Sequence, residues 1–117
     1  MWRRKQHRVI PFVDIHTHLA LAEGTVGLIS HRLGIEPTAR LGAACSVGIH
    51  PWDVDRIEQV ALQLEKLHTL PARAIGEAGL DRACDADFVR QKEIFERQVV
   101  IASERNLPLI IHCVRAQ

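Results

Sequence analysis

Four short apolar runs, at residues 8–15, 42–51, 72–81 and 107–113, divide this chain. Their β-branched and small residues, bordered by prolines, glycines and polar residues, are typical of buried strands. Strands that are apolar on both faces belong to parallel sheets covered by helices. The runs therefore predict the core of an α/β fold.

Helical patterns follow the second and third runs. Residues 52–70 carry apolar side chains at helical spacing, and Asp53 is placed to cap the first turn. Residues 85–106 predict a second helix, which Asn106 and Pro108 end. The expected apolar faces are Val54, Ile57, Ala61, Leu64 and Leu67 in the first helix, and Phe88, Phe95, Val99 and Ala102 in the second.

The segment 21–40 is broken by several glycines and Pro37, and its pattern is compatible with one short strand or a poor helix. Elsewhere strands and helices alternate along the chain. That alternation favours a parallel sheet with helices packed on it.

Side chains that bind metals or move protons collect near the ends of the predicted strands. His16 and His18 close the first strand, His50 closes the second, Glu77 lies in the third and His112 in the fourth. The carboxyl ends of parallel strands share one edge, where active sites form. We therefore expect these side chains to meet.

The sequence His-Thr-His at residues 16–18 indicates a metal site. Alternate strand residues share a face, so the two histidine Cβ atoms lie about 6 to 7 Å apart and their rings can bind one cation at about 2.0 to 2.1 Å. Glu77 can then bridge to a second cation bound by His112, about 3.5 to 4 Å from the first. This donor set suits Zn²⁺, Mn²⁺ and, less well, Mg²⁺.

Other polar residues have structural interpretations. Isolated histidines are more often hydrogen-bonded structural residues than ligands, and His7, His31 and His68 are assigned to that class. Asp81 is expected to make structural hydrogen bonds in the turn after the third strand. Cys113 follows a candidate ligand and points to the opposite face, so we expect it to be buried.

Composition limits the class of protein. With 117 residues, 47% of them hydrophobic and 25% charged, the chain is long enough for one small domain, predicted at 9–117 after a frayed basic terminus at 1–8. Its net charge of +1 gives no overall field for nucleic acid. Three widely spaced cysteines favour a reducing, cytoplasmic setting. No apolar run approaches the roughly 20 residues of a membrane span.

The stretches FVDIHTHL, SVGIHPW, AIGEAGLD and RQKEIFERQVVIASERNLPLIIHC also carry a resemblance. In order and approximate spacing they resemble the TatD family of metal-dependent deoxyribonucleases, over nearly the whole chain after residue 9. The HxH motif alone is shared with other amidohydrolase-like barrels and with histidinol-phosphatase-like domains. The stretch GEAGLD, followed by a helix with glutamine and phenylalanine and then by PLIIHC, is more specific.

The resemblance implies the N-terminal half of a TIM-type (β/α) barrel that hydrolyses DNA phosphodiester bonds with water activated by two divalent metal ions, Mg²⁺, Mn²⁺ or Zn²⁺. On this interpretation His16 and His18 bind the first ion, His112 binds the second, and Glu77 is the bridging and catalytic residue. His50, in the GxHP stretch, contacts a substrate phosphate or has a structural role. The family's HCRDA is HCVRA here, which makes Arg115 a candidate phosphate contact in a shifted register.

The length of the chain indicates an incomplete barrel. A closed barrel needs about 250 residues and eight strands, and this chain supplies about half. We expect a truncated nuclease that binds metal weakly, is inactive alone and associates through its open barrel edge with another copy or its missing half. The alternatives are a related hydrolase of another phosphoester or a cyclic amide, a non-catalytic interaction module, or a decayed gene product.

Overall fold

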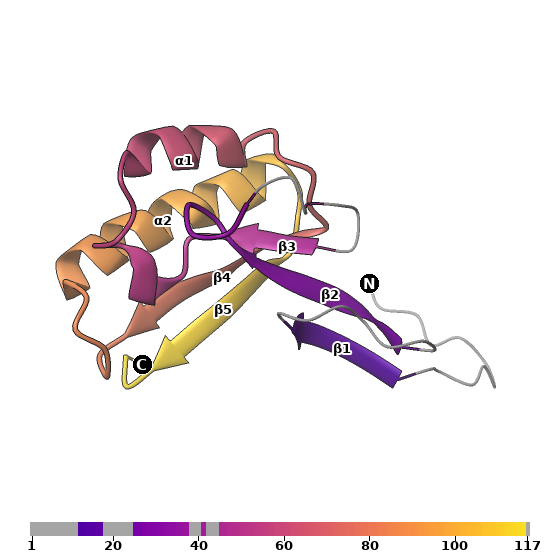
Figure 1. Ribbon diagram of the computed structural model, residues 1–117, viewed down its shortest axis with the longest axis horizontal. Helices are drawn as coiled ribbons and strands as arrows, with labels where there is room; N and C mark the ends of the chain where they lie inside the picture. Colours follow the sequence, from indigo (N-terminus) through magenta and orange to yellow (C-terminus); the bar gives the residue numbers. More distant parts are fainter. Residues whose placement is uncertain (1–11, 18–24, 38–40, 42–44, 117) are drawn as a thin grey trace.

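The computed structural model describes residues 12–17, 25–37, 41 and 45–116, with side chains from residue 28 onward. The expected frayed terminus at 1–8 therefore lies outside the described residues. Three strands come first along the described chain, and helices and strands alternate after β3 (Figure 1). The elements are β1 (Phe12–Thr17), β2 (Thr25–Arg32), β3 (Cys45–Gly48), the 3-10 helix η2 (Pro51–Asp53), α1 (Val60–Leu67), β4 (Ala74–Asp81), α2 (Phe88–Glu104) and β5 (Leu109–Val114).

The five strands form one parallel sheet in the order β1-β2-β3-β4-β5, so every strand pairs with its neighbours in sequence. The register places Ser30 beside Ser46 and Gly79 beside His112. Parallel strands in sequential order are the arrangement from which a (β/α) barrel is built. The fold is thus the half barrel expected from the sequence.

The ambiguous segment 21–40 contains a strand, β2, which pairs with both β1 and β3. Its C-terminal part is buried at Ser30 and His31. Gly34, at φ 84°, then lies in a turn in which a Cβ would approach the Ile57 side chain to 3.0 Å. Of the glycines that obscured the pattern, Gly27 therefore belongs to the strand and Gly34 to its closing turn, whereas Gly24 lies outside the described residues.

The hydrophobic core lies between the sheet and the two helices. Helix α2 packs on β4 and α1 packs on α2, so both helices cover the same side of β3, β4 and β5 (Figure 1). Each large apolar side chain that this packing buries contributes about 1.5–3 kcal/mol to folding. The core includes Leu33, Val47, Ile49, Val54, Leu64, Leu67, Ile75, Ile94 and Ile101.

The first helix is shorter than the sequence predicts. Asp53 does not cap it; its fully buried carboxylate is paired with Arg32, and η2 and a turn occupy the expected first turns. Val54 and Ile57 are buried as expected but precede α1, whereas Ala61 is exposed. Asp53 therefore takes part in a long-range ion pair with Arg32 instead of the helix cap that the sequence predicts.

The buried face of α2 also differs from the prediction. Ala102 is buried as expected, but Val99 is 39% exposed. Two glutamines take central positions because each hydrogen-bonds the backbone at a strand end: Gln98 Oε1 accepts from Ile49 N at 2.8 Å, and Gln91 Oε1 accepts from Asp81 N at 2.7 Å. The buried residues of the helix are Gln91, Ile94, Gln98, Ile101 and Ala102.

Strand β5 forms an edge of the described sheet. Ile111 is 57% exposed and Cys113 is also exposed, which corrects the expectation that Cys113 is buried. The alternation that turns Cys113 away from His112 was foreseen, but no described element covers that face. Within the described part of the chain, no helix has the length and apolar character needed to cross a membrane.

Candidate metal centre

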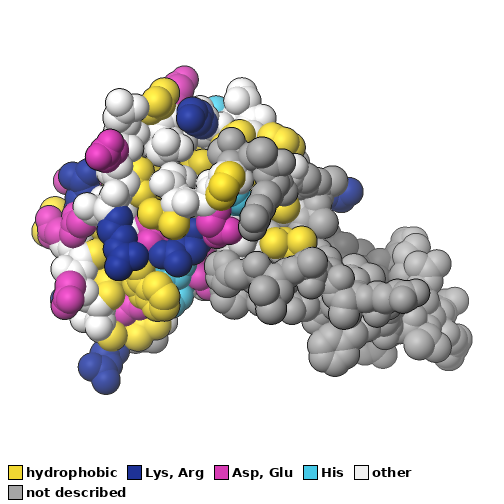
Figure 2. Space-filling view, in the orientation of Figure 1, with side chains coloured by type: hydrophobic (Ala, Val, Ile, Leu, Met, Phe, Trp, Pro, Cys, Tyr) yellow, Lys and Arg dark blue, Asp and Glu magenta, His cyan; other side chains and the backbone are white. Residues whose placement is uncertain are grey.

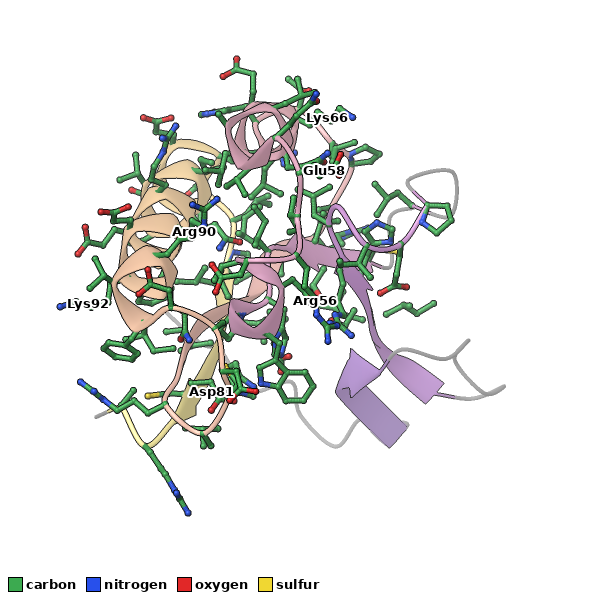
Figure 3. The ribbon with its side chains drawn as sticks, turned by 60° about the vertical axis from the view of Figure 1, so that its left-hand side comes forward. Arg56, Glu58, Lys66, Asp81, Arg90 and Lys92 are labelled. Atoms are coloured by element: carbon green, nitrogen blue, oxygen red, sulfur yellow. The ribbon has the colours of Figure 1, made fainter. Side chains whose placement is uncertain are left out.

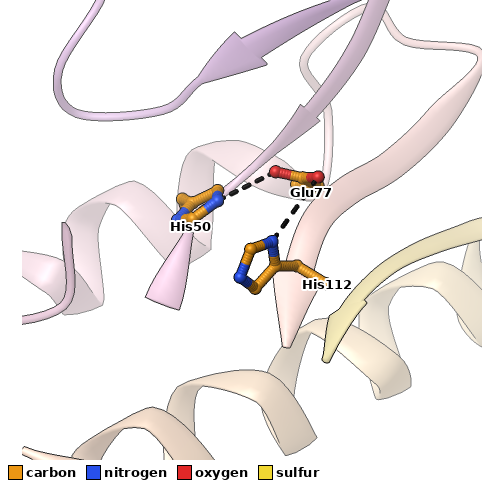
Figure 4. Close-up of side chains that lie close together, drawn as sticks. All are labelled: His50, Glu77 and His112. Atoms are coloured by element: carbon orange, nitrogen blue, oxygen red, sulfur yellow. Dashed lines mark ion pairs between the residues drawn. The ribbon is translucent and has the colours of Figure 1, made fainter. Parts of the chain in front are cut away.

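Three potential metal ligands converge at the carboxyl-end edge of the sheet. His50 lies two residues beyond β3, Glu77 lies in β4 and His112 lies in β5. One donor atom from each lies within 4.8 Å of the others. His50 Nε2 is 2.8 Å from Glu77 Oε1, and His112 Nδ1 is 3.8 Å from Glu77 Oε2 (Figure 4). The Glu77 carboxylate therefore presents one oxygen to each imidazole.

Close contact between β3 and β4 positions the first pair. A Cβ on Gly48 would lie 2.7 Å from Gly76 Cα, closer than real side chains come to backbone. Glycine at both positions lets the two strands approach there. His50 and Glu77 follow these glycines by two residues and one residue, so the backbone approach brings them together.

The imidazole of His50 is fixed in one orientation. Its Nδ1 accepts a hydrogen bond from Trp52 N at 3.1 Å, which leaves Nε2 toward Glu77. Burial lowers the pKa of His50 despite the opposing charge of Glu77. The neutral ring is the form that binds a metal ion.

Asp81 fixes the third ligand. Its Oδ2 accepts from Trp52 Nε1 at 2.7 Å and lies 2.8 Å from His112 Nε2, while its Oδ1 accepts from Ala83 N at 2.8 Å. Burial acts to raise the pKa of Asp81, but the hydrogen bonds it accepts hold that pKa below its ordinary value. A carboxylate that orients a histidine through its second nitrogen is a common outer-shell partner of metal ligands. The hydrogen-bonding role expected for Asp81 is therefore observed.

Arg32 and Asp53 form a charged pair beside this cluster. Arg32 Nε donates to Asp53 Oδ2 at 2.8 Å, and its Nη2 donates to Oδ1. The guanidinium carbon lies 6.0 Å from the centre of the Trp52 ring. The sequence did not predict this pair because the segment of β2 was left open between a strand and a helix and Asp53 resembled a helix cap. No local sequence pattern marks the pair, because Arg32 and Asp53 are 21 residues apart in the chain.

The other predicted site residues have different outcomes. His16 lies in β1, where the structure describes the backbone alone, and His18 lies outside the described residues. Arg115 follows β5 at φ 53° and is exposed. The structure therefore brings together Glu77, His112 and His50 among the six candidates.

The donor set fits a divalent cation. Two imidazoles and one carboxylate, held on three strands, are ligands that Zn²⁺ and Mn²⁺ accept. The Glu77 side chain is 11% exposed and the His112 side chain 17%, so the group borders the surface. In parallel β/α folds the active sites form at these strand ends, and metal ions held there can activate water for hydrolysis.

Comparison with known proteins identifies the family. Residues 29–117 match the model of the TatD related DNase family, so the chain belongs to that family. It is 42% identical over 72 residues to the uncharacterized metal-dependent hydrolase YabD of Bacillus subtilis (strain 168), a match covering 57% of this chain and 28% of YabD. It is 39% identical over 74 residues to the 3'-5' ssDNA/RNA exonuclease TatD of Edwardsiella piscicida, covering 61% and 28%.

A solved structure shares the fold. The crystal structure of YjjV, a TatD homolog from Escherichia coli K12, matches with a TM-score of 0.69 and 22% sequence identity. The match covers 89% of this chain and 51% of YjjV. The chain thus spans about half of that protein, and its matches to the curated relatives span less than a third of them.

Proposed function

We propose that this chain contributes the metal-binding part of a divalent-metal-dependent nuclease site that hydrolyses phosphodiester bonds in DNA. The convergence of His50, Glu77 and His112 within 4.8 Å carries the proposal. On the sequence-based prediction, His16 and His18 would hold a first ion, His112 would hold a second, and Glu77 would serve as a ligand to both. Mg²⁺, Mn²⁺ and Zn²⁺ are the candidate ions.

When bound, divalent ions lower the pKa of a coordinated water and offset charge on the phosphate oxygens. The chain's own residues arrange the site for that chemistry. Neutral His50 and the carboxylate of Glu77 supply the donors, and Asp81 holds His112 so that Nδ1 faces Glu77. For His50 the sequence left a phosphate contact or a structural role open, and we propose it as a metal ligand. Arg115 keeps its proposed role as a phosphate contact from the exposed turn after β5.

Nucleic acid is the substrate class that the family favours. One relative carries the name of an exonuclease of single-stranded DNA and RNA. On the face drawn in Figure 2, Lys and Arg side chains are interspersed with Asp and Glu side chains over the described surface. Binding through the metal site rather than through a broad basic surface is therefore proposed.

Two further features belong to the proposal. The exposed Ile111 and Cys113 on β5 favour self-association, or association with the remaining barrel half, through this edge. Free thiols at Cys45, Cys84 and Cys113 favour a reducing compartment, which we take to be the cytoplasm.

The test measures metal-dependent binding of a phosphodiester by the 117-residue protein. A fluorescein-labelled single-stranded oligonucleotide is titrated at 150 mM salt with Mn²⁺ or with EDTA, and its anisotropy is recorded. We expect Mn²⁺ to tighten binding by about tenfold, the effect of one charge-assisted contact. Glu77→Gln removes that gain, whereas Glu58→Gln, at an exposed position, retains it.

The same samples separate the alternatives. Displacement of the oligonucleotide by p-nitrophenyl phosphate or by dihydrouracil would favour another phosphoester or a cyclic amide as the substrate. Binding that is identical in Mn²⁺ and EDTA and unaffected by Glu77→Gln would overturn the proposal in favour of a non-catalytic interaction module.

A further inference from the structure

A pocket of about 480 Å³ lies beside the metal centre and is not part of it. Trp52, Asp55 and Arg56 line it from the loop after β3, and residues 83–86 line it from the loop after β4. Figure 3 shows Arg56 beside η2 and Asp81 at the end of β4, close to these two loops. Loops at the carboxyl ends of parallel strands are where substrates bind, and pockets of about 300–1,000 Å³ hold small organic groups.

Trp52 lines the pocket and also lies against the metal centre. Its ring centre lies 5.8 Å from that of His112, and its side chain is 47% exposed although it is large and apolar. The ring is held in place because Nε1 donates to Asp81 and the backbone N donates to His50. An exposed aromatic side chain that is fixed before binding costs little conformational entropy when a flat ligand stacks on it.

The charges in the pocket favour a polar, neutral group over a phosphate. Asp55 already accepts a hydrogen bond from Asp87 N and lies 3.7 Å from Arg90 Nε. Arg56 and Asp85 are exposed and of opposite sign. Carboxylate and guanidinium groups hydrogen-bond the amino groups and ring acceptors on base edges. Among the described residues, potential metal ligands converge at Glu77 and its two histidines and not in this pocket.

We propose that this pocket binds an unpaired nucleobase, stacked on Trp52, while the adjoining phosphate occupies the metal centre. The inference rests on the proposed nuclease function and specifies how its substrate is held. A base within a duplex is already stacked and paired, so insertion into this pocket requires an unstacked base. The pocket therefore selects single-stranded segments or frayed ends.

The test uses a ligand without phosphate and a buffer with EDTA, so that it does not depend on the metal centre. The fluorescence of 2-aminopurine riboside, which falls on stacking, is titrated with the 117-residue protein. Aromatic stacking of one base accounts for about tenfold or more in affinity. We expect quenching on binding, a loss of affinity of that size in Trp52→Leu, and a much smaller loss in Trp52→Phe.

Two further variants separate stacking from a structural role. Trp2→Leu changes the chain's other tryptophan and should bind as the wild type does. Ala83→Phe fills the pocket from an exposed position and should block the riboside while the Trp52 side chain is retained. Equal losses in Trp52→Leu and Trp52→Phe would indicate that the hydrogen bond to Asp81 matters and stacking does not.

Failure of this proposal is distinct from failure of the proposed function. Absence of quenching, or quenching unchanged in both Trp52→Leu and Ala83→Phe, overturns the nucleobase pocket. Mn²⁺-dependent oligonucleotide binding that Glu77→Gln abolishes would still stand in that case.

Discussion

The Asp81 oxygen Oδ2 lies 2.8 Å from His112 Nε2, and this contact leaves the other ring nitrogen on the side of Glu77. Because Asp81 is nearly fully buried and also accepts from Trp52 Nε1, its carboxylate has little freedom to move. Asp81 thus orients the ring of His112 through Nε2, the nitrogen that faces away from Glu77, before any ligand binds.

Replacing Asp81 with asparagine tests this orientation. The isosteric amide removes the negative charge that faces His112, and loss of an outer-shell partner lowers metal affinity by about 10- to 100-fold. Calorimetric titration of Mn²⁺ into Asp81→Asn should show this loss. Glu58→Gln serves as the control at an exposed position, and equal Mn²⁺ affinities in the two variants would show that Asp81 does not position the ligand.

Gln98 connects α2 to the strand end that precedes His50. Its amide accepts from Ile49 N at 2.8 Å and donates to Ile49 O at 3.1 Å. In Gln98→Leu both backbone groups lose their partner, and each unsatisfied buried group costs about 1–3 kcal/mol. Urea unfolding should therefore show a free energy of unfolding lower by about 2–6 kcal/mol. Glu96→Ala, on the exposed side of the same helix, should stay within about 0.5 kcal/mol of the wild type.

Gly48 is expected not to tolerate a methyl group. Alanine would place its Cβ 2.7 Å from Gly76 Cα, so β3 and β4 would have to separate. Overpacking of this kind costs about 1–3 kcal/mol, and it would also move His50 away from Glu77. The matched control is Ser46→Ala in the same strand, where the buried hydroxyl has no partner among the described residues. A Gly48→Ala protein as stable as Ser46→Ala would contradict the close approach.

Because His31 is buried, we expect the folded protein to lose stability in mild acid. It is 3% exposed, its Nε2 has no hydrogen-bond partner among the described residues, and burial lowers its pKa below the usual 6.5 despite the opposing charge of Glu36. The unfolded chain therefore binds the proton more readily than the folded one, so stability is greatest above pH 6.5 and falls as the pH drops toward the folded pKa.

The measurement is the free energy of unfolding at several values of pH, for the wild type and for His31→Leu. His50 contributes in the same direction, since burial lowers its pKa as well. In His31→Leu the free energy of unfolding should therefore still depend on pH through His50, but the dependence should be weaker than in the wild type. Parallel curves for the two proteins would show that His31 does not titrate on unfolding.

The sequence predicted the sheet and the meeting of His50, Glu77 and His112 because these features follow from topology. Compact apolar runs marked the strands, and parallel strands align their carboxyl ends whatever the details of packing. The segment of β2 was left open between a short strand and a poor helix because glycines in and around it interrupt the apolar pattern.

Other features depended on partners far apart in the chain. Asp53 has the appearance of a helix cap locally, and its pairing with Arg32 became visible only in three dimensions. The burial of Gln91 and Gln98 reversed a prediction based on apolarity, since both amides satisfy backbone groups at strand ends. Exposure of Cys113 depended on what covers β5, which periodicity does not report.

Binding of a divalent ion by Glu77 and its two histidines is measured most directly by a titration with Co²⁺ followed by its visible absorption. We expect a ligand-field spectrum in the wild type, and in Glu77→Gln either loss of that spectrum or a Co²⁺ affinity lower by about 10- to 100-fold or more. His68→Gln, at an exposed histidine beyond α1, should titrate as the wild type does. Equal Co²⁺ affinities in the wild type and Glu77→Gln would show that these residues do not form a metal site.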